Sequence, residues 1–227
     1  MTTSMIEFFA PLKRRAAYTV NRTKKGDKFY SYEYFREHFR DEIAEDCACR
    51  CVYCDSHEMH VGGRESMELD HFRPWSRPEF AHLKNDPANF HHACGRCNRL
   101  KGAAWPSTHE TEPHDGTVGF VDPFTDDRRQ YFDVRADGTL VCKKHPATYI
   151  AKLLQLDRPF LKLLRLRRIL RAELSAYTET MHLKIKAVAA GEGSLTAEQV
   201  AAEWLKFREY QQLLELCDAP LDSQRGH

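Results

Sequence analysis

The sequence predicts an α+β fold, and segments of three different characters lead to this prediction. Residues 31–45 and the stretch from Thr148 onward place apolar side chains at helical spacing. Residues 47–105 hold most of the cysteines and much of the histidine, with little periodicity. Residues 106–145 contain the turn Asp137-Gly138 between two short segments, 130–134 and 139–143, which predicts a β-hairpin.

The N-terminal segment, residues 1–46, is expected to be helical over about 31–45. Its aromatic and aliphatic side chains recur at roughly helical spacing, and we expect them to pack in a core: Tyr30, Tyr34, Phe35, His38, Phe39 and Ile43.

The C-terminal region, residues 146–227, is expected to be mostly helical. Asp157 before Pro159 predicts a break and a restart within it, and Thr196 and Gln199 have the spacing of a capping box that opens a last helix. The aliphatic residues with mostly helical spacing are Ile150, Leu153, Leu154, Leu161, Leu164, Ile169 and Leu170.

Composition sets few limits on function. The 227 residues include 34 Lys plus Arg against 33 Asp plus Glu, which gives a net charge of +1. This charge neither favours nor excludes binding to nucleic acid, because a local basic face is sufficient for contact with phosphates. No GxxxxGK[ST] motif occurs, so nucleotide hydrolysis is not predicted. The apolar run from Phe8 to Leu12 is too short for a signal peptide or a membrane span, and we expect a cytoplasmic protein.

Two CxxC pairs predict a structural zinc site. Cys51 and Cys54 form the first pair and Cys94 and Cys97 the second, with 39 residues between them. Eight cysteines in a reducing cytosol indicate metal binding more than disulfides, and four thiolates suit a tetrahedral zinc ion. Two unrelated pairs, or a thioredoxin-like redox motif, are the alternatives, but a redox motif leaves the second pair unexplained.

The sequence alone leaves open which cysteines near the first pair are the ligands. Cys47 and Cys49 lie just before it, and either of them could replace Cys51 or Cys54 as a ligand. The spacing of Cys51 and Cys54 matches the second pair, so these two are preferred.

Residues between and beside the cysteine pairs suit phosphodiester hydrolysis. His71 can act as the general base, and Asp70 and Asn98 offer oxygen ligands for a catalytic Mg²⁺ or Mn²⁺. Asn89 can hold the imidazole by hydrogen bonding. Glu68 is either a second acidic ligand or a solvent-facing strand residue.

This pattern resembles the HNH endonucleases. The residues that carry the resemblance are Asp70-His71, Asn89 and the run from Cys97 to Gly102. The resemblance implies a small zinc-stapled ββα-metal nuclease core, here 47–105, flanked by N- and C-terminal helices and extended by a β-hairpin at 106–145. It also implies that Asp70 and Asn98 are metal ligands, that His71 is the general base, and that Asn89 orients it.

Several basic residues are candidates for contact with DNA. Lys101, three residues after Asn98, is expected to reach a phosphate, and Arg73 and Arg99 are further candidates. A run without acidic residues either lines a nucleic-acid groove or forms a solvated helix face: Arg158, Lys162, Arg165, Arg167, Arg168 and Arg171.

A weaker resemblance extends to the PtuB-like nuclease subunits of Septu-type antiphage systems, some of them found beside retrons. It rests on the segments 71–74 and 121–124, a hairpin and a Leu/Arg-rich helix, and Trp75 departs from it where a Lys is expected. It implies a DNA-cleaving component of an antiphage defence system that acts with a separate ATPase. The alternatives are a non-catalytic zinc-finger module that binds nucleic acid or protein, and a nuclease that is silent until a partner docks.

Overall fold

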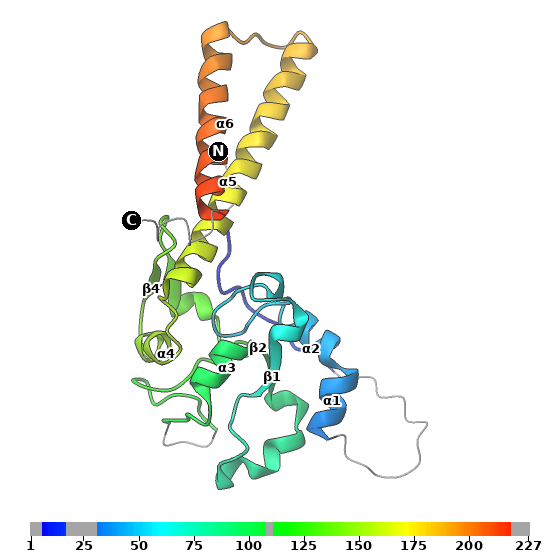
Figure 1. Ribbon diagram of the computed structural model, residues 1–227, viewed down its shortest axis with the longest axis vertical. Coiled ribbons are helices and arrows are strands. Elements are labelled where there is room, and N and C mark those ends of the chain that lie inside the picture. The colour runs from blue at the N-terminus through cyan, green and yellow to red at the C-terminus, as the bar shows by residue number, and fades with distance from the viewer. Residues whose placement is uncertain (1–5, 17–30, 108–110, 219–227) are drawn as a thin grey trace, which may run out of the picture. The chain divides into compact units, whose positions relative to one another are not determined.

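Figure 1 shows the computed structural model, which describes residues 6–16, 31–107 and 111–218. The chain divides into a core unit, Phe8–Asp133 with Leu140–Leu161, and a helical unit, Met1–Glu7 with Val134–Thr139 and Lys162–His227. The predicted mixed α+β fold is confirmed. Parts of the expected segments 1–46 and 146–227, namely 1–5, 17–30 and 219–227, lie outside the described residues.

Two antiparallel strands and a short helix form the centre of the core unit. Strand β1 (Met67–His71) pairs with β2 (Phe90–Cys94), so that Asp70 lies opposite His91 and His71 opposite Phe90. Helix α3 (Gly95–Lys101) follows β2 directly and packs against both strands (Figure 1). Between the strands the chain forms two 3-10 helices, Pro78–Asn85 and Pro87–Asn89. Two shorter 3-10 helices, Glu58–His60 and Arg64–Ser66, precede β1.

The expected N-terminal helix is two helices. Helix α1 (Tyr32–His38) begins after Ser31, whose hydroxyl caps it, and α2 (Arg40–Asp46) follows after Phe39. Phe39 has φ −125° and ψ 14°, which interrupts the helix. The expected core packing is confirmed for Phe35, Phe39 and Ile43, which form a buried cluster with Leu69 and Phe90 of the two strands. Tyr34 packs against this cluster, whereas His38 is exposed, and Tyr30 lies outside the described residues.

The predicted hairpin is present but shorter than expected. Its strands are β3 (Phe132–Val134) and β4 (Leu140–Cys142), and residues 128–130 form a 3-10 helix instead of extending β3. Gly138 adopts φ +81° in the turn, a left-handed conformation that side chains disfavour.

Three helices complete the chain. Helix α4 (Ala147–Leu153) belongs to the core unit, α5 (Pro159–Ala189) starts at the predicted proline, and α6 (Ala197–Asp218) ends the described chain. The capping box is confirmed: the Thr196 amide donates to Gln199 Oε1 at 2.9 Å, and the Gln199 amide donates to Thr196 Oγ1 at 3.2 Å. None of the described helices has the length and apolar character that crossing a membrane requires.

Candidate active site and metal centre

Four cysteines meet in the core unit. Cys51 and Cys54 lie in the turn after α2, Cys94 ends β2, and Cys97 is in the first turn of α3. Their sulfur atoms all lie within 4.8 Å of one another, and all four residues are buried. A tetrahedral zinc ion with bonds of about 2.3 Å separates its sulfur ligands by about 3.8 Å. The donor set and its dimensions therefore fit a structural zinc ion.

The other two nearby cysteines stand outside this cluster. Cys47 is buried at the end of α2, where burial raises the pKa of its thiol to about 12. Cys49 Sγ instead lies 3.8 Å from Arg64 Nη2. Within the described part of the chain, the cluster thus consists of the two CxxC pairs alone. Hydrogen bonds from the three neighbouring thiols lower the pKa of Cys94.

Three of the predicted catalytic residues line one hollow of about 240 Å³. Asp70 and His71 come from the last residues of β1, and Asn98 comes from the middle of α3. The packing of α3 on β1 brings these positions together although they are 27 residues apart or more. Tyr32 and Trp75 also line the hollow, so aromatic rings border its polar centre.

His71 has the tautomer and the charge state of a base. Its Nε2 lies 2.8 Å from the backbone oxygen of Lys84, and because a carbonyl only accepts, Nε2 carries the proton. The lone pair is therefore on Nδ1. The ring of Tyr32 stacks on the imidazole with the ring centres 4.7 Å apart. Burial lowers the pKa of His71, which keeps the imidazole neutral near pH 7.

Asp70 is buried and held by two donors. Lys101 Nζ lies 3.1 Å from its Oδ1 and 2.8 Å from the backbone oxygen of His71, and the Tyr53 hydroxyl donates to its Oδ2. Burial raises the pKa of Asp70, and the charge of Lys101 opposes that shift. The expected contact of Lys101 with a phosphate needs correction: only 2% of this residue is exposed, and its ammonium group is committed to Asp70.

Asn98 is oriented by Glu68. Its Nδ2 donates to Glu68 Oε2 at 2.6 Å, which leaves the carbonyl oxygen of the amide as the group that can bind a cation. Glu68 also lies 3.5 Å from the exposed guanidinium group of Arg99. A carboxylate has about four lone-pair sites, so Asp70 keeps some besides those used by its two donors. The oxygens of Asp70 and Asn98 are the hard ligands that Mg²⁺ and Mn²⁺ prefer.

Asn89 does not hold the imidazole directly. Its Oδ1 accepts from the Arg73 amide at 2.7 Å, and its Nδ2 donates to the Arg73 carbonyl at 2.9 Å. In the described structure its side chain therefore fixes the backbone just after His71, while the carbonyl of Lys84 orients the ring. Arg73 itself donates to the Thr111 carbonyl at 2.9 Å and lies over the ring of Trp105.

Sequence reasoning missed two contributors to this site. Lys84 acts through its backbone oxygen, which no residue type signals. Tyr53, which donates to Asp70, lies between Cys51 and Cys54. Its position could have indicated this contact, because the CxxC turn must face the strands if it shares a metal ion with Cys94.

Comparison with known proteins agrees with this geometry. Residues 51–104 match the family model described as HNH endonuclease. The matched segment begins at the first cysteine of the cluster and ends just beyond α3, so it contains β1, β2, the four cysteines and every residue that lines the hollow except Tyr32. A search of curated proteins found no match.

Proposed function

We propose that this chain, which carries an HNH endonuclease domain at residues 51–104, is a metal-dependent nuclease that hydrolyses phosphodiester bonds in DNA. The observation that carries the proposal is the convergence of Asp70, His71 and Asn98 on one hollow inside the matched segment. A non-catalytic zinc module accounts for the cysteines equally well, but it gives these three side chains no reason to meet.

His71 is assigned the role of general base. Its Nδ1 takes a proton from the attacking water, while the bond from Nε2 to the Lys84 carbonyl holds the ring and stabilises the imidazolium that forms. Tyr32 and the other aromatic walls restrict the ring to one orientation. Asn89 is assigned a positioning role through the backbone of Arg73.

Asp70 and Asn98 are the residues that would hold the catalytic Mg²⁺ or Mn²⁺. When bound, such a cation polarises the phosphate and neutralises the charge that develops during hydrolysis. Lys101 and Tyr53 keep the Asp70 carboxylate in place, and Glu68 turns the Asn98 oxygen away from itself. The four-cysteine site would hold a structural Zn²⁺ that fixes α3, and with it Asn98, against the strands.

Arg73 and Arg99 remain the proposed DNA contacts. The Arg99 side chain is 73% exposed, on the same helix as Asn98. Arg73 is two residues after His71, just beyond the end of β1, and is half-buried, which supports a contact with a phosphate near the hollow. Contacts of this kind position the substrate without reading its sequence.

The biological setting is a further part of the proposal. The resemblance of 71–74 and 121–124 to PtuB-like subunits supports a role in antiphage defence together with a separate ATPase. Exposed apolar side chains on α6, such as Trp204 and Leu216, offer a partner apolar surface. A four-thiolate zinc site needs reduced cysteines, which suits a cytoplasmic location. Co-purification from the native operon tests whether the chain binds an ATPase. Full activity of a chain without a bound partner would contradict the need for one.

Incubation of the purified chain with supercoiled plasmid separates a nuclease from a binding module. We expect nicked or linear product with Mg²⁺ or Mn²⁺, and no product with Ca²⁺ at the same concentration. Single-stranded DNA and RNA in parallel reactions define the substrate. Retarded but intact plasmid under every metal condition would favour the zinc module. Cleavage that appears only after the ATPase is added would show a nuclease that is silent without its partner.

A further inference from the structure

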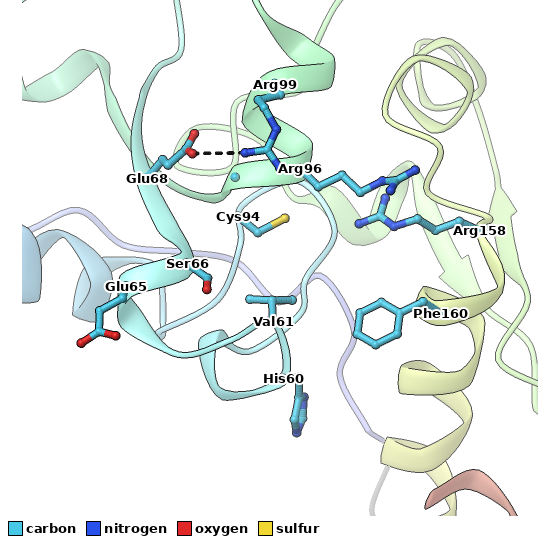
Figure 2. Close-up of a pocket in the computed structure, with 11 residues that line it drawn as sticks. His60, Val61, Glu65, Ser66, Glu68, Cys94, Arg96, Arg99, Arg158 and Phe160 are labelled. Carbon is cyan, nitrogen blue, oxygen red and sulfur yellow. Dashed lines mark ion pairs between the residues drawn. The ribbon is translucent and has the colours of Figure 1, made fainter. Parts of the chain in front are cut away.

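A second hollow in the core unit has no role in the proposed reaction. It has a volume of about 540 Å³ and lies beside Cys94 (Figure 2). Glu68 lines this hollow, while its hydrogen-bond partner Asn98 lines the catalytic one, so the two hollows share a wall. A ligand that enters one therefore lies close to the other.

Two arginines in this hollow lack acidic partners. Arg96 Nη2 donates to Gln155 Oε1 at 2.8 Å, and Arg158 Nη1 donates to the backbone oxygen of the same residue at 3.1 Å. Neither forms an ion pair with a carboxylate in the described part of the chain. Figure 2 shows their guanidinium groups on the same side of the hollow. Arg158 Nη2 also lies 4.0 Å from Cys97 Sγ, a longer contact than a carboxylate ion pair. Two neighbouring positive charges without a carboxylate partner repel each other, and a phosphate relieves that repulsion.

The acidic residues of the hollow leave this position open to an anion. The carboxylate of Glu68 already binds Asn98 and lies against Arg99. Glu65 is exposed, and Figure 2 shows its carboxylate on the opposite side from Arg96 and Arg158.

An aromatic ring completes the hollow. Phe160 is 44% exposed, and Figure 2 shows its ring directed into the hollow from the side of Arg158. An exposed aromatic face beside arginines is the arrangement that holds a base and its phosphate in proteins that bind single strands.

We propose that this hollow binds a nucleotide of the substrate strand, with its phosphate on Arg96 and Arg158 and its base against Phe160. The inference rests on the proposed function and adds a binding site to it. Glu68 and Asp70 are two residues apart on β1, which corresponds to about 7 Å, and a strand of DNA rises about 3.4 Å per nucleotide. The bound nucleotide therefore lies within a few positions of the cleaved bond.

The test measures cleavage and binding of a labelled oligonucleotide at several salt concentrations. The variants are Arg96→Gln/Arg158→Gln and Phe160→Leu, and the matched control is Lys186→Gln/Arg208→Gln, which removes two exposed charges from α5 and α6. Circular dichroism and zinc content verify that each variant is folded. Binding is measured in the His71→Ala background with Mg²⁺ present, so that the substrate stays intact.

The two site variants are expected to differ in a characteristic way. Arg96→Gln/Arg158→Gln should raise KM about ten-fold or more and flatten the slope of log K against log salt by about 0.7 to 0.9, since one phosphate is no longer neutralised. Phe160→Leu should weaken binding about 5-fold to 100-fold with an unchanged slope, because stacking carries no charge. The control should match the wild type in KM, and kcat should stay within about two-fold throughout.

Other results would overturn the inference. A double variant with the KM and salt slope of the control would remove the site. If the wild type cleaves nothing, the binding measurement still tests the inference. Weaker binding by the double variant would then support the nucleotide site, and only the proposed function would be wrong. Equal binding by the double variant and the control would contradict both the site and the proposed function. Calorimetric titration with AMP tests whether the hollow instead binds a free nucleotide. Saturable AMP binding that the double variant loses, with unchanged oligonucleotide binding, would contradict the assignment to the substrate strand.

Discussion

The ammonium group of Lys101 lies 3.1 Å from Oδ1 of Asp70, and both side chains are withdrawn from solvent. This pair joins the end of α3 to the end of β1, the two elements that supply Asp70, His71 and Asn98 to the proposed catalytic hollow. The pair therefore fixes the position of Asp70, a proposed ligand of the catalytic cation.

Lys101→Met should be strongly destabilising. It leaves the carboxylate of Asp70 buried with only the Tyr53 hydroxyl as a donor, and breaking a buried ion pair typically costs about 3–5 kcal/mol. Urea unfolding measures the loss, with the exposed Lys152→Met as a matched control. If the two variants unfold at the same urea concentration, the ion pair does not stabilise the fold.

Removal of one cluster thiol should release zinc. Structural zinc contributes on the order of 10 kcal/mol in small domains, so Cys94→Ser should lose the metal and unfold at a much lower temperature. Cys49→Ser should keep its zinc, because Cys49 lies outside the cluster. Elemental analysis of both proteins is the measurement, and a native protein without zinc would contradict the site.

Asn89→Ala should reduce activity less than the loss of His71. The substitution removes two hydrogen bonds to the backbone of Arg73 in a buried position, at a cost of about 1–3 kcal/mol of stability. We expect a lower kcat at an unchanged metal requirement, measured together with the urea midpoint. An Asn89→Ala protein as inactive as His71→Ala but fully stable would assign Asn89 a direct chemical role.

His91 should make stability sensitive to acid. The residue is fully buried, and neither ring nitrogen has a hydrogen-bond partner among the residues that the structure describes. Burial holds the pKa of His91 well below 6.5, and the positive charges of Arg14, Lys101, Arg128 and Arg73 act in the same direction. The nearest carboxylate oxygen with an ion-pair contact, Asp122 Oδ1, lies 3.9 Å from its Nε2.

The direction of the effect follows from these pKa values. Below pH 6.5 the unfolded chain binds a proton that the folded chain excludes, so stability falls as the pH drops, by up to about 1.4 kcal/mol per pH unit. His91→Phe should unfold with a shallower pH dependence between pH 7 and 5, whereas the exposed His82→Gln should retain the slope of the wild type. Equal slopes for all three proteins would show that His91 is protonated in the folded state.

The sequence predicted which side chains of distinctive chemistry lie together. The four cysteines of the two CxxC pairs meet, and Asp70, His71 and Asn98 line one hollow, and both groups could be named because few other roles require these residue types at this spacing. The orientation of the His71 imidazole could not be predicted, since Lys84 contributes only a backbone oxygen to it.

Other differences arise from packing, which residue spacing does not specify. Lys101 is three residues after Asn98 on the same helix, but its side chain turns inward to Asp70 instead of outward to a phosphate. The break at Phe39 has no proline or glycine to signal it, and Phe35 and Phe39 lie in one core cluster in spite of it.

The most direct test of the account is the cleavage rate of His71→Ala. A general base typically contributes about 10² to 10⁴ in rate, so we expect cleavage of plasmid DNA with Mg²⁺ or Mn²⁺ to fall by that factor while zinc content and unfolding temperature stay near those of the wild type. His82→Ala, which removes an exposed histidine from the segment between the strands, should cleave at the wild-type rate. If His71→Ala cleaves as fast as the wild type in preparations free of contaminating nuclease, His71 is not the base and the catalytic hollow is wrongly assigned.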